Sequence, residues 1–195
     1  MELQYINQAQ LKQLNDILEQ SGVTASDKQL HQLDGYTGLL QKYTRSLSLV
    51  SQADINMIFE RHIIDSLGVL QLLNIKDKPS FLDVGSGNGF PGIPMAIFLP
   101  GSEFTLLDSS EKKTAFLNII KTNLNLVNIN VQNTRVEKYI DGPHPRFNFL
   151  LCRAFKSLNE CVSLLKPLID KNSTLIYFNK RSGDLTDRYT VYPQK

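Results

Sequence analysis

Hydrophobic residues in the first 75 positions recur at the spacing of one face of a helix. Leu11, Leu14, Ile17 and Leu18 share such a face, and Gly22 follows as a stop. The same spacing recurs in residues 26–43 and 54–74, and no alternating strand pattern occurs before residue 80. The sequence therefore predicts a helical N-terminal extension over residues 1–75.

From residue 80 onward the pattern changes to short apolar runs separated by helical stretches. The runs predict strands at residues 80–84, 103–108, 129–133, 147–154 and 174–180. The stretches between them predict helices at residues 94–99, 110–126, 135–139 and 157–168. Alternating strands and helices are typical of an α/β fold with a mostly parallel sheet covered on both faces. We expect this core to span residues 76–180 and a short tail to span residues 181–195.

Composition and charge narrow the class of protein. The chain has 195 residues, of which 42% are hydrophobic, as in a globular domain. No apolar run is long enough to span a membrane, and the N-terminal residues do not resemble a secretory signal, so we expect a cytoplasmic protein. Cys152 and Cys161 are the only cysteines, which is typical of reduced structural thiols.

The charges are unevenly distributed along the chain. Residues 1–110 carry 7 Lys and Arg against 12 Asp and Glu, a balance of −5. Residues 111–195 carry 14 against 7, a balance of +7. This asymmetry indicates either a basic face for a polyanion or charges that mix on the folded surface.

A glycine-rich loop follows the first predicted strand in the segment FLDVGSGNGFPGIP, residues 81–94. Such a loop lets the backbone approach a ligand at the carboxyl end of a strand. The spacing Gly85-x-Gly87-x-Gly89 is typical of a loop that binds S-adenosylmethionine (SAM), whereas Gly87-x-Gly89-x-x-Gly92 matches the dinucleotide fingerprint. Asp108 ends the next strand, where a carboxylate can accept hydrogen bonds from ribose hydroxyls, and both kinds of cofactor have such a ribose.

Five segments in order resemble the RsmG family of bacterial 16S rRNA guanosine-N7 methyltransferases, also called GidB or glucose-inhibited division protein B. They are RHIIDSL at 61–67, DVGSGNGFPGIP at 83–94, LLDSSEKKTAFL at 106–117, RVE at 135–137 and CRAF at 152–155. The resemblance implies a Rossmann-like SAM-dependent methyltransferase fold and methylation of guanine N7 in the 530 loop of 16S rRNA. It implies cofactor contacts from Gly85, Phe90, Val136, Glu137 and Arg153. The implied partner is 16S rRNA or the small ribosomal subunit.

This chemistry needs no catalytic base and no metal, because N7 of neutral guanine already has a free lone pair. Alignment of N7 with the bond that breaks can supply the catalysis. We therefore predict no catalytic acid or base, and we expect His62 to be a structural residue. The RNA-binding candidates are basic residues near strand ends or on the predicted helix at residues 54–74. They are Arg61, Lys156, Lys180 and Arg181.

The family continues beyond the fifth strand with a further helix and two strands, whereas this sequence ends at Lys195. We expect those strands to be missing here and the edge of the fifth strand to stay unpaired, with charged residues guarding it or a disordered tail beside it. Three other functions remain open from the residues. They are a non-catalytic SAM-binding protein, a small-molecule methyltransferase and an NAD-dependent oxidoreductase.

Overall fold

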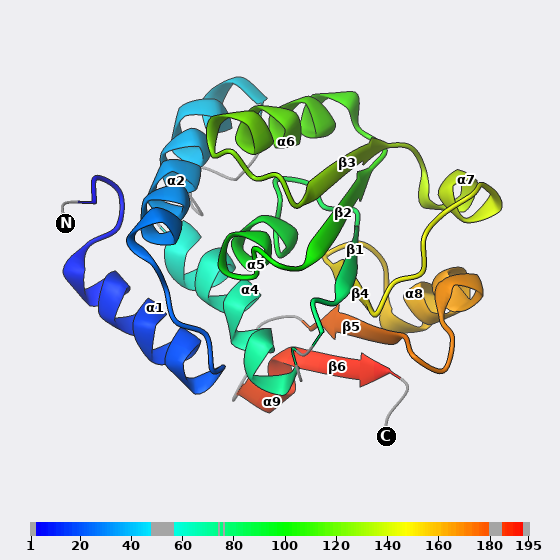
Figure 1. Ribbon diagram of the computed structural model, residues 1–195. Coiled ribbons are helices and arrows are strands. Elements are labelled where there is room, and N and C mark those ends of the chain that lie inside the picture. Colours follow the sequence, from blue (N-terminus) through cyan, green and yellow to red (C-terminus); the bar gives the residue numbers. More distant parts are fainter. Residues whose placement is uncertain (1–2, 48–56, 74, 76, 180–184, 193–195) are drawn as a thin grey trace.

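The computed structural model describes residues 3–47, 57–73, 75, 77–179 and 185–192, in which a six-stranded sheet lies between layers of helices (Figure 1). The strands are β1 (Ser80–Val84), β2 (Glu103–Asp108), β3 (Ile129–Asn133), β4 (Phe149–Arg153), β5 (Thr174–Phe178) and β6 (Tyr189–Tyr192). Their order is β3-β2-β1-β4-β5-β6, and all neighbours are parallel except β5 and β6. The predicted α/β fold with a mostly parallel sheet is confirmed.

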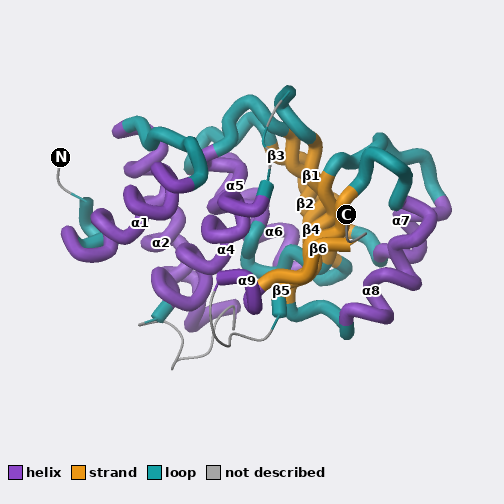
Figure 2. Tube along the Cα trace, turned by 90° about the horizontal axis from the view of Figure 1, so that it is seen from below, coloured by secondary structure: helices purple, strands orange, loops and turns teal. Residues whose placement is uncertain are grey.

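The N-terminal part of the chain forms the outermost helical layer, as Figure 2 shows from below. Its elements are α1 (Gln8–Gln20), α2 (Asp27–Leu47), the π-helix η1 (Phe59–Ile63), α4 (Ile64–Gly68) and the 3₁₀ helix η2 (Val69–Leu72). Asn7 caps α1 in a capping box with Gln10. The Asp34 carboxylate on α2 accepts hydrogen bonds from the backbone N–H groups of Tyr5 at 2.7 Å and Ile6 at 2.9 Å, which holds the segment before α1 against α2.

The remaining helices cover the two faces of the sheet. On the side of the N-terminal layer lie α5 (Gly92–Phe98) and α6 (Glu111–Asn123), and on the opposite side lie α7 (Val136–Asp141), α8 (Leu158–Leu165) and the 3₁₀ helix η3 (Lys166–Leu168). No helix among the described residues is long and apolar enough to cross a membrane.

The pleat of the strands divides the apolar side chains between two cores. Phe81, Phe104 and Leu151 are buried on the face toward α5 and α6, whereas Leu82 and Cys152 are buried on the face toward α7 and α8. Phe81 stacks on Phe104 with ring centroids 4.5 Å apart. Because alternate residues of each strand enter opposite cores, the polar residues at the strand ends are also directed to defined faces.

The C-terminal residues add a helix and a sixth strand that the sequence did not predict. After α9 (Leu185–Arg188), strand β6 pairs antiparallel with β5, with Tyr189 opposite Phe178. The Tyr189 hydroxyl donates a hydrogen bond of 2.6 Å to the carbonyl of Asp65, and the Tyr189 ring packs edge-on against Phe178. The expectation that the edge of the fifth strand stays unpaired is therefore wrong, because β6 supplies its ladder of hydrogen bonds.

Candidate functional site

The glycine loop leaves β1 and enters α5 through backbone conformations that side chains rarely adopt. Gly85 has a φ of +72°, and an added Cβ there would lie 2.7 Å from Cδ2 of Phe155. The N–H groups of Gly85 and Ser86 both donate to the carbonyl of Leu107, at 2.8 and 3.0 Å. The loop is thus fixed against the end of β2, with Phe155 packed over its first glycine.

Asp108 connects the glycine loop to the second strand. One of its carboxylate oxygens accepts the N–H of Gly87 at 2.8 Å, and the other accepts the N–H of Ser110 at 2.8 Å. Its side chain is buried, yet it lines an open cavity. Each carboxylate oxygen has further lone pairs, so Asp108 can hold the loop and still accept a hydrogen bond from a ligand hydroxyl.

Asp83, two residues before the loop, is enclosed in the protein interior with only 1% of its surface exposed. Its Oδ2 atom accepts the N–H of Gly92 at 3.0 Å, which holds the start of α5. Burial raises the pKa of Asp83 from its ordinary 3.8 to about 7, although the hydrogen bonds from Gly92 and Ser86 oppose the shift.

This raised pKa predicts how stability depends on pH. Between about pH 4 and pH 7 the folded protein retains a proton on Asp83 that the unfolded chain releases, so Asp83 makes stability fall as the pH rises through this range. We expect Asp83→Asn to remove this contribution to the pH dependence of the free energy of unfolding. Denaturant titrations of both proteins from pH 4 to pH 8 should show the wild type losing stability relative to the variant up to about pH 7. Parallel profiles would contradict the prediction.

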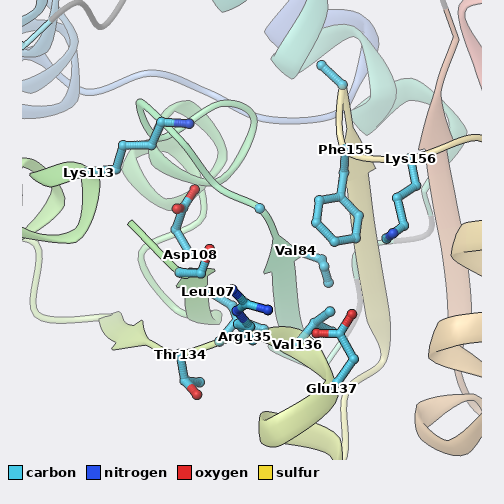
Figure 3. A pocket seen from close by; sticks show the side chains of 13 residues that line it. Val84, Leu107, Asp108, Lys113, Thr134, Arg135, Val136, Glu137, Phe155 and Lys156 are labelled. Carbon is cyan, nitrogen blue, oxygen red and sulfur yellow. The ribbon is translucent and has the colours of Figure 1, made fainter. Parts of the chain in front are cut away.

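A cavity of about 390 Å³ opens at the carboxyl ends of the strands, beside the glycine loop. Figure 3 shows its walls, in which Asp108 and Lys113 lie on one side and Phe155 and Lys156 on the other. Its apolar wall includes Val84, Leu107 and Val136. The volume is within the usual range of small-ligand sites, and the position outside the carboxyl ends of β1, β2 and β4 is where α/β sheets bind ligands. We name this space the first cavity.

Four of the six residues predicted to contact a cofactor line the first cavity together. They are Gly85, Asp108, Val136 and Glu137. Val136 is buried at the start of α7, and the neighbouring Glu137 is exposed with its carboxylate at the rim (Figure 3). An acidic acceptor, a glycine backbone and apolar walls in one cavity are the groups that a nucleoside needs.

Phe90 and Arg153 are not among the residues that line the first cavity. Phe90 is buried and stacks on His62 with ring centroids 5.0 Å apart. Arg153 forms an ion pair of 3.2 Å with Asp65 on α4, and one of its nitrogens donates to Nδ1 of His62 at 3.0 Å. Burial lowers the pKa of Arg153, and Asp65 opposes that shift. These contacts join the end of β4 to the N-terminal layer, and the structural role of His62 stays a prediction.

The structure describes two of the four RNA-binding candidates, Arg61 and Lys156. Arg61 is exposed on η1, and Lys156 is exposed after β4, where it lines the first cavity and a second one beside it. Lys180 and Arg181 lie outside the described residues.

Phe155 and Lys113 line the first cavity but were not among the predicted site residues. Phe155 follows β4 directly, so its place after a strand end could have indicated the site. Lys113 lies on the first turn of α6, and helical periodicity alone predicts only an exposed side chain there. Among the described residues, no group of three or more His, Cys, Asp and Glu is placed to hold a metal ion.

Comparison with known proteins identifies close relatives of the chain. The family model of GidB, rRNA small subunit methyltransferase G, matches residues 29–186. The ribosomal RNA small subunit methyltransferase G of Serratia proteamaculans is 39% identical over 166 residues, which cover 85% of this chain and 78% of the relative. That of Klebsiella pneumoniae is 41% identical over 153 residues, which cover 78% of this chain and 72% of the relative.

Solved structures resemble the chain in fold. Coclaurine N-methyltransferase aligns with a TM-score of 0.56 and 15% sequence identity over 87% of this chain and 56% of that protein. At this level of identity the similarity concerns the fold alone.

Proposed function

Because the chain belongs to the GidB family of rRNA small subunit methyltransferases G, which use SAM, we propose that it methylates N7 of a guanine in the 530 loop of 16S rRNA. The observation that carries this proposal is the first cavity, where Asp108 and the glycine loop meet at the carboxyl ends of β1 and β2. We further propose that the protein acts in the cytoplasm, where small ribosomal subunits are found.

The residues of the first cavity suit SAM. Asp108 would accept hydrogen bonds from the ribose hydroxyls, and Val136 and Leu107 would contact the adenine. Glu137 would accept from an amino group, and Gly85 would allow the cofactor to approach the backbone. When bound, SAM supplies a methyl group on a positively charged sulfur, which a neutral nitrogen nucleophile can accept.

The chain itself would act by positioning and by excluding water. N7 of guanine attacks through its free lone pair, so no side chain has to remove a proton first. The walls formed by Val84, Leu107 and Phe155 remove water from the site, which strengthens the electrostatic contacts inside it. Alignment of the two reactants can account for a large part of the acceleration.

Methyl transfer can be tested on small subunits and on naked 16S rRNA that lack the modification. We expect incorporation of a methyl group at one guanine, detected as N7-methylguanine by borohydride reduction and aniline cleavage. Incorporation at a different atom would contradict the N7 assignment. Binding of SAM without transfer to either substrate would favour a non-catalytic SAM-binding protein, and binding of NAD in its place would favour an oxidoreductase.

Basic side chains near the first cavity predict a salt-dependent affinity for RNA. Lys113, Arg135 and Lys156 line that cavity from three different elements. Each phosphate of a single-stranded RNA that such a side chain neutralises adds about −0.7 to the slope of log affinity against log salt concentration. We expect Lys156→Gln to make the slope less steep by about this amount, measured by fluorescence anisotropy with a labelled RNA hairpin.

Lys171→Gln is the matched control, because Lys171 is an exposed lysine just before β5. It lies at the amino ends of the strands, opposite the carboxyl ends where the first cavity opens. The control should leave the slope unchanged. An affinity that does not vary with salt, or an equal effect of both substitutions, would contradict the placement of RNA at the carboxyl ends of the strands.

A further inference from the structure

A second cavity, of about 920 Å³, adjoins the first on the other side of the turn that follows β4. Both cavities are lined by Ala154, Phe155 and Lys156, so this turn forms their common wall. The other walls come from Met57 just before η1, from η1 and α4, and from the ends of β4 and β5, and their residues include Asp65, Arg153, Tyr177 and Phe178. A reactant in the second cavity would therefore be separated from the first by only one turn of chain.

The common wall is held in an unusual conformation by specific contacts. Ala154 has a φ of +49°, in the left-handed region that residues other than glycine seldom adopt, and such strain is concentrated at functional sites. The Tyr177 hydroxyl donates a hydrogen bond of 2.9 Å to the carbonyl of Lys156. The Phe155 ring is thereby presented beside Gly85 at the junction of the two cavities.

Arg153 lines the second cavity, and one of its terminal nitrogen atoms has no hydrogen-bond partner among the described residues. Its Nη2 atom contacts the Asp65 carboxylate at 3.2 Å and donates to the carbonyl of Arg61 at 2.8 Å. Its Nη1 atom is buried and has no hydrogen-bond partner among the described residues. Leaving a buried donor unsatisfied is costly, and native proteins rarely do so unless a ligand or a water completes the contact.

We propose that the second cavity receives the guanine base of the RNA substrate, with Arg153 Nη1 donating to O6 and Asp65 accepting from N1–H. This proposal rests on the function proposed above and assigns its acceptor subsite. Arginine is the side chain that most often recognises O6 of guanine, and adenine carries an amino donor at that position instead. Phe155 and Tyr177 provide the aromatic surfaces on which a base turned out of an RNA loop stacks.

The proposal can be tested by NMR without measuring methyl transfer. The sequence has three methionines, of which Met57 lines the second cavity and Met95 is completely buried in α5. With methionine methyl groups labelled and S-adenosylhomocysteine saturating the first cavity, GMP and then AMP are titrated. We expect GMP to shift the Met57 signal, leave Met95 unchanged and bind at least about tenfold more tightly than AMP.

Two variants separate recognition from stacking. Arg153→Lys keeps a positive charge beside Asp65 but has one terminal nitrogen in place of two, so it cannot contact Asp65 and O6 from separate nitrogens, and the preference for GMP should disappear. Tyr177→Leu should weaken GMP and AMP alike and preserve their ratio, since stacking does not depend on the base. Tyr192→Leu, an exposed tyrosine on β6 opposite Leu175, is the control and should change neither affinity.

The outcomes distinguish this proposal from the one on which it rests. If S-adenosylhomocysteine binds but Met57 does not respond to GMP, or responds equally to AMP, the second cavity is not the guanine subsite and the cofactor site stands. If S-adenosylhomocysteine fails to bind, the proposed function fails at its cofactor. A GMP preference that survives Arg153→Lys in a folded protein would overturn the role of Arg153.

Discussion

Asp108→Ala is expected to weaken the binding of SAM by about 1–3 kcal/mol, which corresponds to roughly 5-fold to 150-fold in affinity. The ribose hydroxyls would lose the carboxylate that accepts their hydrogen bonds, and the N–H groups of Gly87 and Ser110 would lose their present acceptor. The substitution therefore removes a ligand contact and also releases the glycine loop from β2. Calorimetric titration with S-adenosylhomocysteine measures the affinity, and thermal unfolding reports the loosened loop.

Glu103→Gln provides the matched control, because Glu103 is an exposed acid at the other end of the same strand. It should change the affinity for S-adenosylhomocysteine by less than the error of the titration. If Asp108→Ala binds as tightly as the wild type, the ribose contact is absent. A wild-type protein that binds NAD instead of SAM would show that the loop serves a dinucleotide.

The sheet could be predicted from the sequence because its strands are short, buried apolar runs. In β1, β2, β4 and β5 most residues are buried, so polar boundaries mark where each strand begins and ends. Strand β6 was missed because it has four residues, YTVY, directly after a one-turn helix. Its aromatic and β-branched residues are typical of strands, but so short a run is recognised only through its pairing with β5.

The cofactor site could be predicted where the chemistry depends on strand ends, and less well where it depends on the face of a strand. Asp108 and Gly85 come together because β1 and β2 are parallel neighbours. Arg153 follows the pleat of β4, in which Leu150 and Cys152 enter one core and Leu151 the other. Arg153 is therefore directed toward Asp65, a contact across 88 positions that no local pattern indicates.

Gly85→Ala is expected to lower the affinity for SAM by about tenfold or more, because the added methyl group displaces the ring of Phe155. The new methyl group would lie 2.7 Å from Cδ2 of that ring, so the ring would have to move into one of the two cavities that it lines. The positive φ of +72° adds a backbone cost of about 1–2 kcal/mol to the stability of the fold. Calorimetry with S-adenosylhomocysteine and denaturant unfolding separate the two effects.

Gly22→Ala isolates the backbone cost, because Gly22 has nearly the same φ of +69° and nothing within 4 Å of an added Cβ. Gly85→Ala should lose at least as much stability as Gly22→Ala, whereas only Gly85→Ala should lose affinity. Adding Phe155→Ala to Gly85→Ala removes the ring that the methyl group meets, so the two substitutions together should cost less affinity than the sum of their separate effects. Strict additivity, or an equal loss of affinity in Gly22→Ala, would show that Phe155 does not transmit the change from the glycine loop to the cavity.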